Sequence, residues 1–410
     1  MKTNYGIKNW LFLAIAVLIT IPGLWLRLYG IHISPQFEAM IFGLAILGAA
    51  FLLCWACEVA QMDISQALAL ALIALIAVLP EYVVDAYFAW TAGNNAQYIP
   101  YVTANMTGAN RLLIGIGWSL VAFLFWLKKR RTIEVGKEQT TELSFLLLAT
   151  LYSFIIPIKG TLSLIDSIFL LTLFILYMRT SSRGEVEPPE LTGPAVSIGC
   201  LSKGIRRTVT IGLFIFAAVA ILASAEPFAE GLLGMGKAWG IEEFILVQWL
   251  APLASEAPEI AIAVIFVLGN NGGAALGTLV SSKVNQWTLL VATMPIVYSI
   301  SRGAPGVLLL DGRQVEEILL TSAQSLFALS ILARLRLPAW GALTLFFLFI
   351  TQLAFPNPWV RYGYSAVYIV LALVALFKDK QTIKSLYSML QQTFSLIKSP
   401  GKGVSNHLSR

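Results

Sequence analysis

Long apolar runs, separated by short polar segments, account for most of the chain. The runs lie at about residues 10–29, 38–57, 63–92, 99–127, 143–158, 161–180, 206–228, 240–269, 274–302, 314–334, 338–355 and 361–377. A helix needs about 20 mostly apolar residues to cross a bilayer. The pattern predicts an all-α polytopic membrane protein of about twelve transmembrane helices, the first of them retained rather than cleaved as a signal peptide.

The composition agrees with a lipid environment. Hydrophobic residues make up 58% of the chain and charged residues 12%, whereas a soluble domain carries about 25% charged residues. Lys and Arg exceed Asp and Glu by 28 to 22, but the basic residues lie between apolar runs, which is a pattern of membrane orientation. We therefore expect the bilayer, and not nucleic acid, as the partner. Cys54 and Cys57 form a CxxC inside an apolar run without a second ligand pair, so we interpret them as packing residues.

The basic residues are distributed very unequally between the two sides of the predicted spans. One side holds twenty and the other holds six, while Arg111 and Lys283 fall inside spans. Because Lys and Arg concentrate in cytoplasmic loops, we expect an integral membrane protein, in a bacterial plasma membrane, with both termini in the cytoplasm. The tail beyond Phe377 mixes lysines with apolar residues at helical spacing, which suits either a basic amphipathic helix on the inner leaflet or a partly disordered tail.

Two of the longer regions of the chain repeat one unusual pattern. Each places a Pro-Glu pair deep in an apolar run, follows it with a Gly/Asn turn, and re-enters the membrane with a small, polar stretch. The pairs are Pro80-Glu81 and Pro258-Glu259, the turns lie at 93–95 and 269–273, and the polar stretches at 103–110 and 277–283. Glu81 lies on the third predicted span and Glu259 on the eighth, so the two copies enter the membrane from opposite sides. Such inverted repeats place a binding site near the bilayer midplane.

Proline gives this pattern a chemical meaning. It removes one backbone hydrogen bond and leaves a carbonyl of the preceding turn free. A free carbonyl beside a carboxylate is an oxygen ligand set that suits Na⁺ or Ca²⁺. We therefore predict a core of two inverted repeats of five helices, with one extra helix at each end. The predicted boundaries are 1–37 for the extra N-terminal helix, 38–180 for the first repeat, 181–205 for a cytoplasmic linker, 206–355 for the second repeat, and 356–410 for the last helix and basic tail.

These residues resemble the alpha repeats in the membrane region of sodium/calcium exchangers, in the calcium/cation antiporter superfamily. Each repeat of that family carries a Gly-Thr-Ser-Leu-Pro-Glu type motif on one helix and a Gly-Asn-x-x-Gly-Ser-Asn type motif on the next. Here 79–81 and 257–259 resemble the first motif, and 104–110 and 277–283 resemble the second. The chain departs from the family at Lys283, which stands where Asn is usual, and at Leu113, which replaces a polar side chain.

The resemblance implies that Glu81 and Glu259 are the central carboxylates of a metal cation site, with Ser255, Ser282 and Gln286 as supporting oxygens. Asp85 shares a helix face with Glu81, as Glu256 does with Glu259, because residues three or four apart lie side by side. The candidate cation-binding residues are Glu81, Glu259, Asp85, Glu256, Ser255, Ser282, Gln286, Asn105 and Asn110.

Arg111 and Lys283 are basic residues in the same two helix pairs, and an ionisable group inside a span costs about 2.5–3.5 kcal/mol on insertion scales. One hypothesis is structural: Arg111 pairs with Asp85 or Glu81, and Lys283 with Glu256 or Glu259. The other is mechanistic: the Lys283 ammonium occupies the place of a bound cation or titrates. Both hypotheses stay open at this point.

The sequence predicts a secondary active cation antiporter that exchanges Ca²⁺ or Na⁺ for Na⁺ or H⁺. Small inorganic cations are its only expected ligands; no cofactor is expected, and the oligomeric state is left open. The alternatives are a cation/proton exchanger, a channel, and a non-exchanging relative in which Lys283 fills the cation site. An intramembrane hydrolase would be an enzyme, but no Ser-x-x-Lys spacing, His-Glu-x-x-His or phosphate loop is present.

Overall fold

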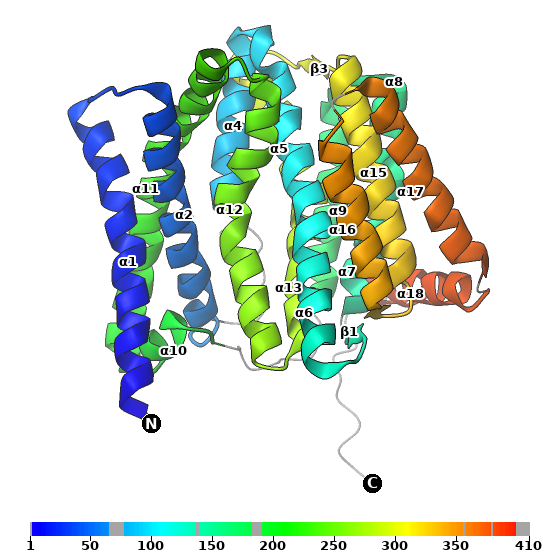
Figure 1. Ribbon diagram of the computed structural model, residues 1–410, viewed down its shortest axis with the longest axis horizontal. Helices are drawn as coiled ribbons and strands as arrows, with labels where there is room; N and C mark the ends of the chain where they lie inside the picture. The colour runs from blue at the N-terminus through cyan, green and yellow to red at the C-terminus, as the bar shows by residue number, and fades with distance from the viewer. Residues whose placement is uncertain are drawn as a thin grey trace.

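The computed structural model describes residues 2–64, 78–136, 139–182, 191–355, 357–378 and 380–398. Most of its helices stand side by side, roughly parallel to one another (Figure 1). Within these ranges nine helices are long and apolar enough to cross a bilayer, and Ala339–Leu353 is a shorter apolar helix. The chain is therefore an α-helical membrane protein, as its apolar runs predict. The predicted span 63–92 falls partly outside the described residues.

Four helices pack together at one side of the molecule (Figure 1). They are α1 (Lys2–Tyr29), α2 (Pro35–Ala60), α10 (Pro194–Gly199) and α11 (Lys203–Trp239). Their buried side chains form a hydrophobic cluster of their own, which includes Leu52, Ala56, Ala217 and Ile221. At about 1.5 Å per residue, the 37 residues of α11 extend well beyond the hydrocarbon thickness of a membrane.

The length of α11 differs from the sequence expectation. The apolar run predicts that this helix ends at 228, but it continues to Trp239 and keeps Pro227 in its interior. The added turns pack into the molecule, because Leu232, Leu233 and Met235 are buried there. Glu230 Oε1 also accepts hydrogen bonds from the hydroxyls of Tyr87 (2.6 Å) and Tyr98 (2.8 Å).

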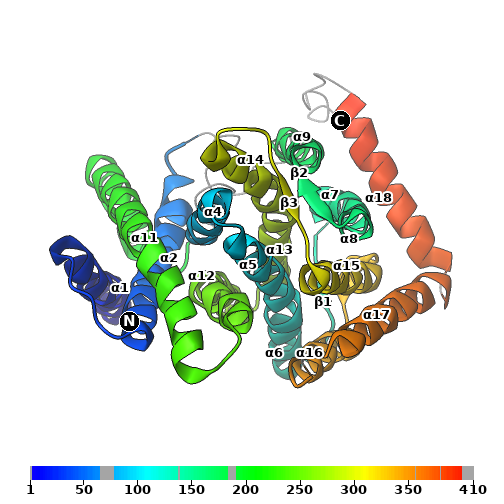
Figure 2. The same ribbon diagram turned by 90° about the horizontal axis from the view of Figure 1, so that it is seen from above.

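Two sets of helices form the centre of the molecule (Figure 2). The first consists of α4 (Leu79–Asn94), η1 (Ala96–Tyr98), α5 (Ile99–Leu112), η2 (Leu113–Trp118) and α6 (Ser119–Lys129). The second consists of α12 (Glu243–Leu268), α13 (Gly272–Asn285), η4 (Gln286–Leu290) and α14 (Val291–Arg302). Helix α12 packs against α5, and α14 packs against α4. Both η2 and η4 are π-helical, a conformation that is frequent at functional sites.

The remaining helices cover the other side. They are α7 (Thr140–Ser153), α8 (Ile155–Lys159), α9 (Leu164–Ser181), α15 (Gly312–Leu332), α16 (Ala339–Leu353), α17 (Pro358–Lys378) and α18 (Lys380–Lys398). Helix α18 lies across the ends of the upright helices (Figure 1). The central helices and this side share one large hydrophobic core.

Two short antiparallel ladders join the loops of distant helices. Strand β1 (Ile133–Glu134) pairs with β4 (Arg336–Leu337), and β2 (Thr161–Ser163) pairs with β3 (Val307–Leu309). Helix α15 runs from β3 to β4, and α7 with α8 runs from β1 to β2. The two ladders therefore lie at opposite ends of the bundle (Figure 1).

Candidate cation-binding site

Four acidic side chains are buried on α4 and α12. Glu81 lies in the first turn of α4, directly after Pro80, and its side chain is shielded from solvent together with that of Asp85 one turn later. On α12, Glu256 and Glu259 stand on either side of Pro258 inside the helix and are buried as well. Charged side chains are costly in such surroundings, so this concentration needs protons, cations or counter-charges.

The two helices bring acids from both predicted repeats together. The carboxyl groups of Glu81 and Glu256 face each other at hydrogen-bonding range, and Asp85 and Glu259 also act electrostatically on Glu81. Neither carboxyl oxygen of Glu81 has a hydrogen-bond donor among the described residues. Two carboxylates at this range repel each other unless a proton or a cation lies between them.

Among these acids, Glu256 acts most strongly on Glu81, ahead of Asp85 and Glu259. Glu256 Oε1 accepts a hydrogen bond of 2.6 Å from Gln286 Nε2, the first residue of the π-helical η4. Glu259 Oε1 instead lies 3.8 Å from the Sγ of Cys54 on α2. Cys54, which its place in an apolar run predicts to be a packing residue, thus lies beside this acid, and no spacing along the chain indicates that position.

Helix α5 contributes two carboxamides. Asn105 Nδ2 donates to Asp85 Oδ1 over 2.8 Å. Asn110 Oδ1 accepts from Lys283 Nζ at 2.6 Å, and the Asn110 carbonyl lies 3.2 Å from the same nitrogen. The structure therefore places Lys283 on Asn110 rather than on Glu256 or Glu259. Lys283 is fully buried, its Nζ lies 4.6 Å from the centre of the Trp287 ring, and Glu81 and Glu256 are within electrostatic range of it.

Arg111 points away from the acids of α4. Its Nη2 lies 2.5 Å from Glu317 Oε2 on α15, and the Trp249 ring covers its guanidinium at 4.9 Å. Neither Asp85 nor Glu81, the partners considered from the sequence, pairs with it in the described structure. Glu317 carries no motif and is about 200 positions away, so only helix packing reveals this partner.

A close approach of two backbones holds α5 against α12. A Cβ added to Gly108 would lie 1.8 Å from the carbonyl oxygen of Gln248, so only glycine fits at this position. The neighbouring residue of α5, Thr107, accepts a hydrogen bond at its Oγ1 from Gln248 Nε2, over 3.3 Å. These contacts fix α5, which carries the two carboxamides, against α12, which carries Glu256 and Glu259.

The sequence matches the family described as sodium/calcium exchanger protein over residues 37–182 and again over 209–356. The chain belongs to the sodium/calcium exchanger family. Members of this family are exchangers of inorganic cations rather than enzymes, so the hydrolase alternative is wrong and the predicted superfamily is confirmed.

Solved structures of exchangers resemble this one. An H⁺/Ca²⁺ exchanger, CAX, is 45% identical, with a TM-score of 0.90 over 96% of this chain and 100% of that chain. The sodium–calcium exchanger NCX_Mj is 19% identical, with a TM-score of 0.53 over 82% of this chain and 100% of that chain, and so shares the fold. An uncharacterised membrane protein of Methanocaldococcus jannaschii is 26% identical over 211 residues, and the match spans 50% of this chain and 62% of that protein.

Two candidate residues remain, one on α12 and one on α13. Ser255 is buried, and its Oγ reaches carbonyls of its own helix at 3.3 Å (Pro252) and 3.4 Å (Ala251). Ser282 is buried beside Lys283. In the described part of the exchanger, no three His, Cys, Asp or Glu side chains are grouped so that they could hold a metal ion. A bound cation would therefore need oxygens from serine, carboxamide or backbone groups as well.

Three other acids, on or next to α2 and on α11, have partners of their own. Glu58 accepts from the backbone N–H (2.6 Å) and the hydroxyl (2.8 Å) of Thr192, and Glu226 lies 2.5 Å from Arg27. Asp63 pairs with Arg206 at 2.8 Å. These groups join α2 and α11 to neighbouring segments.

Proposed function

We propose that this protein is a secondary active exchanger that moves Ca²⁺ in one direction and H⁺ in the other, by alternating access around Glu81 and Glu259. The observation that carries the proposal is the group of buried acids on α4 and α12, in which Glu81 faces Glu256 without a donor of its own. Such a group binds either protons or a divalent cation, and one ligand displaces the other. The 45% identical CAX is an H⁺/Ca²⁺ exchanger, which supports protons as the counter-ion.

The ligand set follows from the chemistry of Ca²⁺, which takes six to eight oxygen ligands. Glu81 and Glu259 are the central carboxylates in this proposal, with Glu256 and Asp85 next to them. Neutral oxygens come from Ser255, Ser282, Gln286, Asn105 and Asn110. Because Gln286 and Asn105 already bond to Glu256 and Asp85, they hold these carboxylates in place or exchange those bonds for a bond to the ion.

The inverted repeat is the architectural part of the proposal. Several features occur in matching pairs: a Pro-Glu pair on α4 and α12, an Asn cap at Asn95 and Asn271 before the next helix, and a π-helical segment at η2 and η4. The ladders β1–β4 and β2–β3 at opposite ends of the bundle also correspond. Two copies entering the membrane from opposite sides would expose a central site alternately to each side.

The proposal also includes the orientation of the termini and the boundaries of the two repeats. We place both termini in the cytoplasm of a bacterial cell, on the basis of the basic residues between the spans. The repeats correspond to 38–180 and 206–355, close to the two family matches, and the additional helices at each end flank them.

The test is counter-transport in proteoliposomes. Purified protein is reconstituted, and ⁴⁵Ca²⁺ uptake is driven by an outward proton gradient and, separately, by an outward Na⁺ gradient. Wild type is expected to respond to the proton gradient, and Glu81→Gln and Glu259→Gln are each expected to lose at least about 95% of the uptake. Glu226→Gln, which changes a half-exposed acid paired with Arg27, is the matched control and should keep most of it.

Each outcome discriminates between candidates. Uptake at wild-type level in both glutamine variants rejects the site. Uptake driven by Na⁺ but not by protons supports the second candidate, a sodium/calcium exchanger, for which the family match is the specific observation. Absence of any counter-transport in wild type, with activity in Lys283→Asn, supports the non-exchanging relative.

A further inference from the structure

A groove lies between α18 and the ends of two upright helices. Its volume is about 490 Å³, and it is lined by Thr140, Ala333, Arg334, Leu335, Gln381, Lys384, Ser385, Ser388, Met389 and Gln392. Helix α15 ends at Leu332 and α7 begins at Thr140, so the groove lies at the depth where these membrane-spanning helices leave the hydrocarbon. Phospholipid headgroups occupy this same depth.

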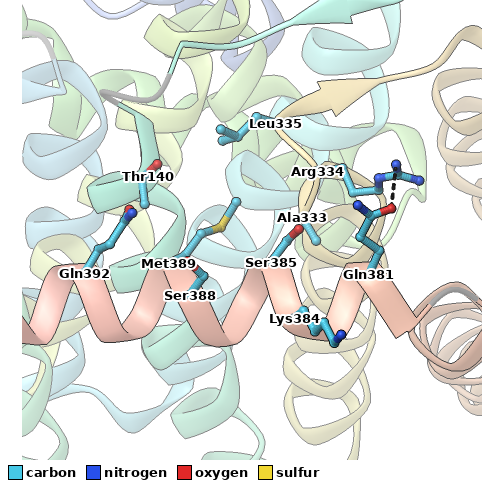
Figure 3. Close-up of a pocket in the computed structure, with 10 residues that line it drawn as sticks. All are labelled: Thr140, Ala333, Arg334, Leu335, Gln381, Lys384, Ser385, Ser388, Met389 and Gln392. Carbon is cyan, nitrogen blue, oxygen red and sulfur yellow. Dashed lines mark hydrogen bonds between the residues drawn. The ribbon is translucent and has the colours of Figure 1, made fainter.

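The lining is positively charged and rich in hydrogen-bonding groups. Arg334 at the end of α15 and Lys384 on α18 are among the ten residues that line it, and none of the ten is acidic. In Figure 3 the Lys384 side chain extends to the side of α18 that faces away from Leu335. Figure 3 shows Arg334 directed at Gln381, to which its Nη2 donates at 3.4 Å, and the hydroxyl residues of α18 between Lys384 and Gln392. Guanidinium, ammonium and hydroxyl groups together are the donors that proteins use to bind phosphate.

Helix α18 itself is seated at a membrane surface. Its Met389 and Thr393 are buried, and the helix packs against α7. Ile383, Tyr387 and Phe394 share another face and are 42%, 68% and 46% exposed. An amphipathic helix with exposed apolar side chains and lysines lies in the plane of the interface, as α18 does across the bundle (Figure 1).

We propose that this groove binds the phosphate of an anionic phospholipid and so fastens α18 to the bundle. The phosphate accepts hydrogen bonds from Arg334, from the neighbouring hydroxyls and from Lys384, whose exposed, flexible side chain turns toward the groove when the lipid binds, while the acyl chains lie in the adjacent bilayer beside the exposed apolar face of α18. A soluble phosphate offers the same oxygens but no acyl chains, and the depth of the groove favours the lipid. This binding site is separate from the acids of α4 and α12, and its test does not depend on exchange activity.

The experiment measures lipid binding to the full-length protein in detergent. Dioctanoyl phosphatidylglycerol, dioctanoyl phosphatidylcholine and inorganic phosphate are titrated separately, and bound species are counted by native mass spectrometry. Wild type is expected to bind one phosphatidylglycerol at least about tenfold more tightly than phosphatidylcholine. The double variant Arg334→Gln/Lys384→Gln is expected to weaken this binding at least about tenfold, since a charge-assisted contact is worth about one tenfold step or more.

The matched control removes two positive charges nearby but outside the groove, as Lys378→Gln/Lys380→Gln. It should change the affinity less than about threefold. The single variant Lys384→Gln alters an exposed side chain and keeps the test valid if the double variant does not fold; it should weaken binding about threefold or more. Equal losses in the groove and control variants, or equal binding of both lipids, overturn the proposal. Inorganic phosphate that binds as tightly as the lipid overturns the lipid as the ligand.

Discussion

Glu317 is the centre of a buried charge network, and neutralising it tests how the core of the exchanger is held together. Its carboxylate lies 2.5 Å from Arg111, 3.0 Å from Arg313 and 3.7 Å from Arg361. The side chains of Arg111 and Glu317 are each 2% exposed. Removing one partner of such a pair costs about 3–5 kcal/mol, because the other charge stays buried without compensation.

Most of this cost arises at Arg111. In the Glu317→Gln variant, Arg361 keeps Glu316 at 2.7 Å, and the more exposed Arg313 keeps Glu242 at 3.8 Å, whereas Arg111 has no second acid paired with it in the described structure. At about 2 °C per kcal/mol for a large domain, Glu317→Gln should lower the unfolding temperature by about 6–10 °C. The assay is the fraction of protein that stays monodisperse after heating for a fixed time, because membrane proteins often unfold irreversibly.

Two further variants separate the burial effect from a general effect of charge. Glu242→Gln removes a half-exposed acid of the same network and should shift the temperature by no more than about 2 °C, since exposed pairs contribute about 0–1 kcal/mol. Arg111→Met/Glu317→Gln removes both members of the buried pair and should recover more than half of the loss. Two results would contradict a buried pair that stabilises the core. One is a fall in unfolding temperature for Glu242→Gln as large as that for Glu317→Gln. The other is a double variant no more stable than Glu317→Gln alone.

Two other predictions concern the cation site. Lys283→Asn removes a positive charge within electrostatic range of Glu81 and Glu256, so the Ca²⁺ concentration for half-maximal uptake in proteoliposomes should fall about fivefold or more. The control Lys283→Arg keeps the charge and should leave this concentration nearly unchanged. A higher concentration in Lys283→Asn would contradict the prediction. Gly108→Ala places a Cβ 1.8 Å from the carbonyl oxygen of Gln248 on α12, so α5 and α12 must separate, and both thermal stability and Ca²⁺ uptake should drop severely. The control is Gly212→Ala, whose added Cβ meets nothing within 4 Å and which should match wild type.

The apolar runs and the two Pro-Glu pairs can be identified from the sequence because the bilayer constrains each spanning segment locally. Every backbone polar group in the hydrocarbon must be satisfied within its own helix, so each span is a continuous apolar segment and each exception is visible as a proline or a charge. The class of fold follows from this, and so does the attention to Glu81 and Glu259, whereas the exchanger family follows from the resemblance of the residues around them to that family's motifs. Their roles as ligands stay a prediction for the transport assay.

Only the tertiary structure decided which side chains face one another. Glu81 faces Glu256, Lys283 bonds to Asn110, and Arg111 bonds to Glu317. These partners lie on different helices, up to about 200 positions apart, and their meeting depends on how each helix is rotated about its axis and how closely its backbone approaches the next, as Gly108 does at Gln248. Hydropathy records that a residue lies in the membrane but not the direction in which it points, so this information exists only in the packed molecule.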